Sequence, residues 1–217
     1  MSDSIKSLFD AARQLGLEMS EEQAQALLMY IEQMQRWNKT YNLTALKNKE
    51  QMLVQHIFDS LSVVMPLRKK LAGRKTVNVL DVGSGGGLPG IVLAIMTATW
   101  NICCIDAVER KTAFVRQMSG VLRLPNLSAQ HIRIEQRTEP QVDLVISRAF
   151  ASLADFASLA GKHVDASGYL VAMKGHYIQD EVNELVSRTE WEEASHETLE
   201  VPELDAKRCL IWLQRKG

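Results

Sequence analysis

A glycine-rich stretch at residues 77–90, VNVLDVGSGGGLPG, limits the possible folds of this chain more than any other part of it. Its first six residues are mostly apolar and predict a buried strand. The glycines that follow permit a sharp turn and a close approach of a ligand to the backbone, because they carry no Cβ. Pro89 suits the start of a helix, whose apolar body is residues 91–96. A strand, a glycine loop and a helix N-terminus in this order predict a cradle for a nucleotide-like ligand.

Predicted strands and helices alternate after this stretch, which is typical of a mostly parallel sheet. The last strand is apolar on both faces, so we expect it inside the sheet. Ser167-Gly168 is expected to form a turn just before the fifth strand. The pattern predicts an α/β fold with seven strands and helices on both faces. The further strands are expected at residues 101–106, 127–131, 142–147, 169–173, 197–201 and 208–214, and the helices at 110–122, 153–163 and 180–186.

The first part of the chain has a helical pattern without strands. Helices are expected at residues 4–15, 20–37 and 50–64, and Ser20 with Gln23 has the spacing of a capping box. Residues 37–44 are expected to form a structured loop. Its Trp37 and Tyr41 either anchor the helices or offer a surface for stacking bases. We therefore expect residues 1–65 to be a helical extension that packs on a core of residues 66–217.

Composition narrows the class of protein. A hydrophobic content of 46% and a charged content of 24% indicate a folded chain, and its apolar runs are too short to cross a bilayer. The N-terminal segment has the mixed charge of an amphipathic helix and no signal-peptide core, so a cytoplasmic protein without membrane contact is expected. The three cysteines lack the spacing of a zinc site or a disulfide framework and are expected to be reduced strand residues. No metal site is predicted.

Charge is unevenly distributed along the chain. Residues 180–205 hold ten acidic residues and one basic residue, Arg188, although the net charge of the whole chain is only −1. The preceding part is mildly basic. This distribution is compatible with a nucleic-acid substrate that is held away from the acidic segment. An ordinary solvated acidic surface explains it equally well.

Two ligands compete for the glycine loop. Gly85, Gly87 and Gly90 satisfy a dinucleotide fingerprint, which would suit a nicotinamide oxidoreductase. Asp81, however, precedes the glycines, and a carboxylate there suits the cationic amine of S-adenosylmethionine better than a pyrophosphate. Asp106 ends the next strand, where it would accept hydrogen bonds from the ribose hydroxyls of either cofactor. Asp81 therefore favours S-adenosylmethionine.

Other candidate site residues follow later strands or lie on the third predicted helix. Ile134 and Glu135 come after the strand at 127–131, where a loop would cover an adenine, although an ordinary loop is an equal alternative. Arg148 and Phe150 follow the strand at 142–147 and would lie next to the glycine loop. Three weaker candidates for lining a target pocket, for which structural roles are favoured, are His56, Asp59 and Lys174.

Several motifs together resemble one family. They are Asn38 with NLT at 42–44, HIFDSL at 56–61, DVGSGGGLPG at 81–90, ISRAFASL at 146–153 and MKG at 173–175. The chain is similar over nearly its whole length to the small-subunit ribosomal RNA guanine-N7 methyltransferases, also called glucose-inhibited division protein B. The resemblance implies a Rossmann-like class I S-adenosylmethionine-dependent methyltransferase fold. It also implies a guanine substrate in the 530 loop of bacterial 16S rRNA, guanine 527. The implied cofactor contacts are Gly83, Leu88, Ile134, Glu135 and Arg148, beside Asp81, Gly85 and Asp106 from the loop argument.

The chemistry of this substrate explains why no catalytic triad is visible. Guanine N7 already carries a free lone pair, so alignment and electrostatics are expected to suffice. We expect Arg148 to order the site and hold donor or base, and Phe150 to stack on guanine. The partner would be 16S rRNA in the small ribosomal subunit or an assembly intermediate, bound by a monomer. The alternatives are a methyltransferase for another RNA or a small molecule, a dinucleotide oxidoreductase, and an RNA-binding protein without turnover. The basic residues expected to bind RNA are Arg110, Lys111, Arg116 and Arg123, with Lys39 and the basic cluster at residues 68–75 as further possibilities.

Overall fold

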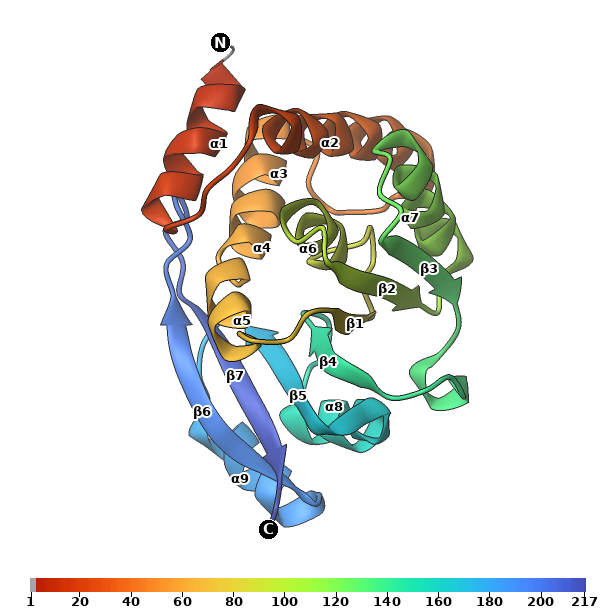
Figure 1. The fold of residues 1–217 in the computed structure, drawn as a ribbon, viewed down its shortest axis with the longest axis vertical. Helices are drawn as coiled ribbons and strands as arrows, with labels where there is room; N and C mark the ends of the chain where they lie inside the picture. The colour runs from red at the N-terminus through yellow and green to blue at the C-terminus, as the bar shows by residue number, and fades with distance from the viewer. Residues whose placement is uncertain (1–2) are drawn as a thin grey trace.

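Seven strands form one sheet in the computed structural model, which describes residues 3–217 (Figure 1). The strands lie in the order β3-β2-β1-β4-β5-β7-β6. Neighbours from β3 to β5 are parallel, whereas β7 is antiparallel to both β5 and β6. The predicted α/β fold with a mostly parallel sheet is confirmed, as is the interior place of the last strand. The strands are β1 Val77–Val82, β2 Trp100–Asp106, β3 Leu127–His131, β4 Val142–Ser147, β5 Val164–Lys174, β6 Trp191–Leu199 and β7 Arg208–Arg215.

Helices cover both faces of the sheet, because alternate residues of its central strands are apolar on both sides. Val79 of β1 belongs to a hydrophobic cluster with helices α1 to α7, and the next residue, Leu80, belongs to a second cluster with α8 and α9. The helices of the first face are α1 Asp3–Gln14, α2 Glu21–Tyr41, α3 Lys49–Met52, η1 Leu53–Phe58, α4 Asp59–Leu61, α5 Val64–Lys70, α6 Gly90–Met96 and α7 Glu109–Val121. Those of the second face and its loops are η2 Ile134–Gln136, α8 Leu153–Ala160, η3 Gly161–His163 and α9 Gln179–Arg188.

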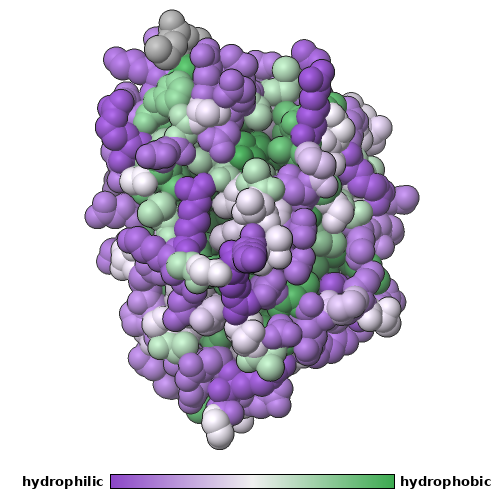
Figure 2. Space-filling model, viewed as in Figure 1, coloured by the Kyte–Doolittle hydropathy of each residue, from purple (hydrophilic) through white to green (hydrophobic). Residues whose placement is uncertain are grey.

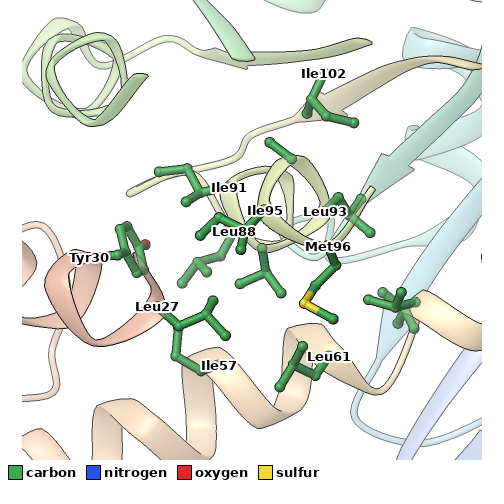
Figure 3. Packing of buried hydrophobic residues seen from close by; sticks show 14 of the residues in the cluster. Leu27, Tyr30, Ile57, Leu61, Leu88, Ile91, Leu93, Ile95, Met96 and Ile102 are labelled. Carbon is green, nitrogen blue, oxygen red and sulfur yellow. The ribbon is translucent and has the colours of Figure 1, made fainter. Parts of the chain in front are cut away.

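The N-terminal helices pack directly on the part of the core that carries the glycine loop. The capping box predicted at Ser20 and Gln23 is present at the start of α2. Figure 3 shows α6 enclosed by α2, by the helical segment that holds Ile57 and Leu61, and by Ile102 of β2. The whole body of α6 is buried. Helix α2 and the segment that holds Ile57 and Leu61 therefore support the helix that follows the glycine loop.

Two predictions in the N-terminal region were wrong. Residues 37–41 are not a loop, because α2 continues to Tyr41 and ends only where Asn42 adopts a left-handed conformation with φ of 49°. The single helix predicted at residues 50–64 is interrupted by the π-helix η1, and a further helix, α5, extends it to Lys70. Apolar spacing predicts that a segment is helical, but it does not report which carbonyl each amide binds.

Two strand boundaries also differ from the predictions. Ser167 and Gly168 lie within β5, which begins at Val164 and has an irregular register against β4 between Val142 and Leu144. Strand β6 begins at Trp191 rather than near residue 197. Glutamates in its sequence hid this strand, because its outer residues are exposed and charged.

The acidic segment forms α9 and the edge strand β6. Charged side chains on an edge strand oppose pairing with other chains. Several of these acids also have partners: Glu197 accepts a hydrogen bond from the Trp212 indole at 3.0 Å, and Glu193 from the Tyr177 hydroxyl at 2.9 Å. Figure 2 shows hydrophilic residues over most of the face drawn in Figure 1. The charged side chains of β6 in the acidic segment therefore protect the edge of the sheet from pairing with other chains.

The three cysteines are free thiols, with Cys104 and Cys209 buried in strands and Cys103 half-buried, as predicted. Between residues 3 and 217, no group of histidine, cysteine and acidic side chains could hold a metal ion. No helix in the same range combines the length and the apolar character needed to cross a membrane.

Candidate active site

The candidate site lies where the order of the strands reverses. Strand β1 has β2 on one side and β4 on the other, so the loops that follow these strands diverge at their carboxyl ends. Open α/β sheets bind ligands at such a switch point. The glycine loop follows β1, and Arg148 to Ala151 follow β4. The structure thus brings the two most distinctive motifs of the sequence together.

The glycine loop needs its glycines for conformation and for space. Gly83, Gly85 and Gly87 have φ values of +67°, +59° and +93°, a region that side chains with a Cβ rarely adopt. A Cβ on Gly83 would also lie 3.0 Å from the Cβ of Ala149. Behind the loop, the buried Tyr30 hydroxyl of α2 donates a hydrogen bond of 2.9 Å to the carbonyl of Gly86. Helix α2 therefore holds the glycine loop through a buried side-chain contact.

Asp81 is fully buried beneath this loop. Its Oδ2 accepts a hydrogen bond of 2.7 Å from the backbone N–H of Gly90, while its Oδ1 has no partner among residues 3–217. Burial raises the pKa of Asp81 to about 7, although the Gly90 N–H opposes the shift. Asp81 lines none of the three hollows described below. The Asp81 carboxylate therefore does not contact a ligand in these hollows directly, and it can affect ligand binding only through the conformation of the glycine loop.

Asp106 stands at the other side of the loop, at the end of β2. Its Oδ2 accepts from the N–H of Gly85 at 2.9 Å, and its Oδ1 from the N–H of Val108 at 2.8 Å. Unlike Asp81, it lines a hollow, at the position where sequence reasoning expected a ribose. Its side chain is therefore both held by the loop and open to a ligand.

Three adjoining hollows meet around the loop. The strand-end hollow has a volume of about 220 Å³ and is lined by Gly83, Asp106, Ile134, Glu135, Ala149 and Phe150, among others. The glycine-loop hollow, about 230 Å³, shares Gly83 and Ala149 with it and adds Gly85, Leu88 and Arg148. The arginine basin, about 460 Å³, shares His56 and Arg148 with the glycine-loop hollow and adds Asp59, Lys174 and Arg208.

Phe150 and Arg148 border different hollows. Phe150 lines the strand-end hollow together with Ile134 and packs against Phe156, with ring centroids 5.0 Å apart. It does not line the arginine basin. The β4 loop turns between Arg148 and Phe150, so that two neighbouring motif residues face different hollows. Sequence spacing alone did not reveal this turn.

A buried carboxylate connects two arginines at the basin. Asp59 is only 2% exposed, and its two oxygens accept hydrogen bonds of 2.9 Å from Arg148 and from Arg208. Arg148 also donates to the carbonyl of Gln55 at 3.3 Å. The carboxylate thereby orients both guanidinium groups while each remains partly exposed to the basin.

His56 lies beside this ion network and is neutral near pH 7. Burial and the nearby Arg148 lower its pKa to about 4. Its Nδ1 contacts the carbonyl of Gln55 at 3.2 Å, which assigns the ring proton to Nδ1, and its Nε2 then accepts from the Thr44 hydroxyl at 2.9 Å. Both ring nitrogens are occupied, so His56 acts as a support for the Thr44 loop rather than as a free base.

Lys174 ties the β4 loop to α9. Its Nζ donates to the carbonyl of Ala151 at 2.8 Å and pairs with Glu181 at 2.8 Å. Lys174 also lines the arginine basin. It therefore has the structural role favoured from the sequence and is also accessible to a substrate.

The four basic residues predicted to bind RNA do not form one surface at the site. Arg110 and Lys111 lie in the first turn of α7, near the site, and Lys111 is 3.9 Å from Asp106. Helix α7 then runs back along the sheet, and the Ser119 hydroxyl near its end bonds to the carbonyl of Leu127 at the start of β3. Arg116 is exposed partway along this helix, and Arg123 follows its end, at the opposite edge of the sheet.

Sequence reasoning missed Arg208, Gln55 and Thr44. Arg208 opens the last strand, 149 residues after Asp59, and nothing near it in the sequence marks it as a site residue. Gln55 contributes through its backbone carbonyl, which any residue type could provide. Thr44 was part of a motif, and its hydroxyl is placed by the His56 contact.

The residues present fit S-adenosylmethionine. The glycine cradle joins two hollows, and a Cβ at Gly83 would narrow it. The first hollow has an acidic residue, Asp106, and apolar walls formed by Ile134 and Phe150. The second hollow is bordered by Arg148. Such a pair of joined hollows suits a ligand with an apolar ring, a polar sugar and a charged tail. The further basin beyond Arg148 leaves room for a second reactant.

Comparisons with known proteins agree with this geometry. Crystal structures with similar folds include a ribosomal protein L11 methylase from Lactobacillus delbrueckii, with a TM-score of 0.57 and 13% identity over 73% of this chain and 79% of that one. Another is an S-adenosylmethionine-dependent methyltransferase from Aquifex aeolicus, with a TM-score of 0.54 and 18% identity over 75% and 92%. These likenesses support the class I methyltransferase fold.

Relatives at higher identity define the family. A protein named ribosomal RNA small subunit methyltransferase G from Bordetella petrii is 59% identical over 96% of this chain and 82% of its own length. One of the same name from Leptothrix cholodnii is 45% identical over 97% and 95%. The GidB family profile, described as rRNA small subunit methyltransferase G, matches residues 23–211. The chain therefore belongs to the GidB family of small-subunit rRNA methyltransferases.

Proposed function

We propose that this protein transfers a methyl group from S-adenosylmethionine to N7 of a guanine in 16S rRNA. One observation carries the proposal within the fold: the hollow suited to an adenosine and the arginine basin are joined by the glycine-loop hollow, through Gly83 on one side and Arg148 on the other. A donor in the first two hollows would present its reactive end to a base in the third. Membership of the rRNA methyltransferase family supports RNA as the acceptor.

The cofactor would be held by three kinds of contact. Asp106 is positioned for the ribose hydroxyls, Ile134 and Phe150 for the faces of the adenine, and the backbone of Gly83 and Gly85 for the tail. Leu88 and Arg148 would border the tail, and Glu135 the adenine edge. Asp81 would act from beneath the loop by shaping it through Gly90.

The chain's own residues need not remove a proton. When bound, S-adenosylmethionine supplies a methyl group to the lone pair that guanine N7 already carries. His56 is neutral and has a hydrogen bond at each ring nitrogen, which is consistent with a reaction that needs no general base. What the protein supplies is alignment, with Asp59 holding Arg148 and Arg208 at the basin where the base would lie.

The test is methyl transfer to small ribosomal subunits from cells that lack this activity. We expect labelled methyl from S-adenosylmethionine to appear at a single guanine, and chemical cleavage at N7-methylguanine to locate it. Incorporation at another atom, or into protein, would contradict the proposal. Calorimetry with S-adenosylmethionine and NAD separately tests the cofactor, and binding of NAD alone would exclude a methyl donor.

A finer assignment follows from the same proposal. We infer guanine 527 of the 530 loop as the target, within the subunit or an assembly intermediate, and a cytoplasmic monomer as the active form. Residues 1–65 would be an extension that supports the core at residues 66–217, as the contact between Tyr30 and Gly86 suggests. Cleavage mapping on intact subunits and on protein-free rRNA would distinguish the substrates, and sedimentation would report the oligomeric state.

The position of Phe150 adds a second test. Since Phe150 lines the hollow with Ile134, the substitution Phe150→Leu should weaken binding of S-adenosylmethionine and leave the affinity for rRNA unchanged. The reverse result would return Phe150 to the guanine-stacking position expected from the sequence.

A further inference from the structure

A groove beside the arginine basin has no part in the function described so far. This helix groove has a volume of about 790 Å³ and is formed by the second half of α2 and the loop at residues 42–48. Thr44 and Ala45 line both the helix groove and the arginine basin. A polymer that enters the basin can therefore continue into the groove across this loop.

The helix groove is basic. Arg36 and Lys39 on α2 and Lys47 on the facing loop are exposed, and none of them pairs with a carboxylate between residues 3 and 217. Glu32, which also lines the groove, is neutralised by Lys49 at 3.5 Å. Three uncompensated cations on two facing walls attract a polyanion.

Three other basic residues, which precede the glycine loop, already have partners within the fold. Arg74 binds Asp143 and the carbonyl of Ser167, Arg68 binds the carbonyl of Met96, and Lys70 lies over the ring of Tyr169 at 5.2 Å. Arg68, Lys70 and Arg74 of the basic cluster at residues 68–75 therefore have structural partners, whereas Lys69 and Lys75 are exposed and lie outside the helix groove.

The wall between groove and basin is firmly held. The Asn38 side chain donates to the carbonyl of Leu46 at 2.9 Å and accepts from the N–H of Thr44 at 2.9 Å. The Thr44 hydroxyl accepts from the N–H of Leu46 at 3.2 Å and bonds to His56. The loop is thus arranged before any ligand arrives, which lowers the entropic cost of binding.

Amide groups complete the groove. The side chains of Gln35 and Asn42 line it and make no hydrogen bond within residues 3–217. Amides both donate and accept, so they suit base edges and ribose hydroxyls as well as phosphates. A groove that combines cations with free amides and opens into a base-sized basin fits an unpaired RNA strand.

We propose that the helix groove binds the RNA strand that continues from the target guanine, with Arg36, Lys39 and Lys47 on its phosphates. This inference rests on the proposed function, because the guanine in the basin sets where the strand begins. It assigns the RNA contact mainly to α2 and its following loop, rather than to the length of α7.

The experiment compares the full chain with the variant Arg36→Gln/Lys39→Gln/Lys47→Gln. Binding to unmethylated 30S subunits and to protein-free 16S rRNA is measured from low to physiological salt. Each phosphate contact with a single strand contributes about 0.7 to the slope of log affinity against log salt, so the variant should lower the slope by about 2. We expect KM for subunits to rise about tenfold, while kcat and the affinity for S-adenosylmethionine stay unchanged.

The control variant Lys6→Gln/Lys69→Gln/Lys75→Gln removes the same charge from exposed lysines outside the groove. It should keep the wild-type salt slope. Equal slopes for the groove variant and the wild type would overturn the proposal, as would equal effects of both variants. An effect on 30S subunits without one on protein-free rRNA would assign the groove to a ribosomal protein and also overturn it. Absence of methylation by the wild-type chain would instead contradict the proposed function, a result that does not depend on any substitution.

Discussion

Two buried aspartates at the same edge of the sheet are stabilised in different ways. Asp81 has one hydrogen bond, from a backbone N–H nine residues later, and its second oxygen has no partner within residues 3–217. Asp59 has an arginine on each oxygen, from residues 89 and 149 positions away. A carboxylate paired with cations can stay charged when buried, whereas one with only a backbone donor gains a proton more easily. The first aspartate shapes a loop, and the second positions two cations.

The largest effect is expected from Asp59→Ala. The substitution leaves Arg148 and Arg208 without the carboxylate that they share. The free energy of unfolding should therefore fall by about 3 kcal/mol. Urea denaturation measures this change, and Asp81→Asn at pH 6 is the matched control, since it keeps an acceptor for Gly90. If both variants lost the same stability, the two aspartates would not differ as described.

Arg148→Ala should lower kcat/KM for methyl transfer by about 100-fold, the usual cost of losing one well-placed electrostatic group. Stability should change less than in the Asp59 variant, because Asp59 keeps Arg208. Steady-state kinetics on 30S subunits test this expectation. Arg148→Lys keeps the charge without the fork of donors and should recover only part of the rate. Unimpaired methylation by the alanine variant would remove Arg148 from the site.

Gly83→Ala tests the loop that Asp81 supports. The residue has φ of +67°, where an L side chain costs roughly 1–2 kcal/mol, and the new Cβ would press on Ala149. We expect lower stability together with weaker binding of S-adenosylmethionine, measured by calorimetry. Gly120→Ala is the control, because Gly120 lies in α7 with open space around it and should gain roughly 0.5–1 kcal/mol. If Gly83→Ala changed neither stability nor the affinity for S-adenosylmethionine, the glycine loop would not require glycine at this position.

The smallest effect concerns pH. The folded-state pKa of Asp81 is raised to about 7, so its protonated form stabilises the fold at low pH and this contribution is lost as pH rises between about 4 and 7. The folded-state pKa of His56 is lowered to about 4, so stability from this group increases as pH rises from about 4 to 6.5. The two slopes oppose each other, and the wild type should be nearly flat in that range.

Asp81→Asn removes one of these slopes. The stability of that variant should rise with pH by about 1 kcal/mol per unit between pH 4.5 and 6.5, and that of His56→Asn should fall by a similar amount. Urea midpoints at several pH values measure both. Parallel pH profiles for the two variants would show that one of the buried groups does not titrate as its surroundings indicate.

Local features were predicted well where neighbours in the sequence decide them. The strand at residues 77–82, the helix after Pro89 and the capping box at Ser20 depend on apolar runs, glycines and caps, all within a few positions. The π-helix η1 and the early start of β6 were not predictable in this way. The π-helix depends on which carbonyl each backbone N–H binds, and the start of β6 depends on its pairing with β7.

What the sequence by itself determined is the cofactor cradle and the fold around it, because a strand, a glycine loop and a helix start occupy consecutive residues and dictate their own backbone. Only the tertiary structure decided how the substrate side is assembled. Asp59, Arg148 and Arg208 come from three distant parts of the chain, and Arg148 and Phe150 are two positions apart yet face different hollows. Long-range ion pairs and the turn of a loop depend on packing, which no local pattern records.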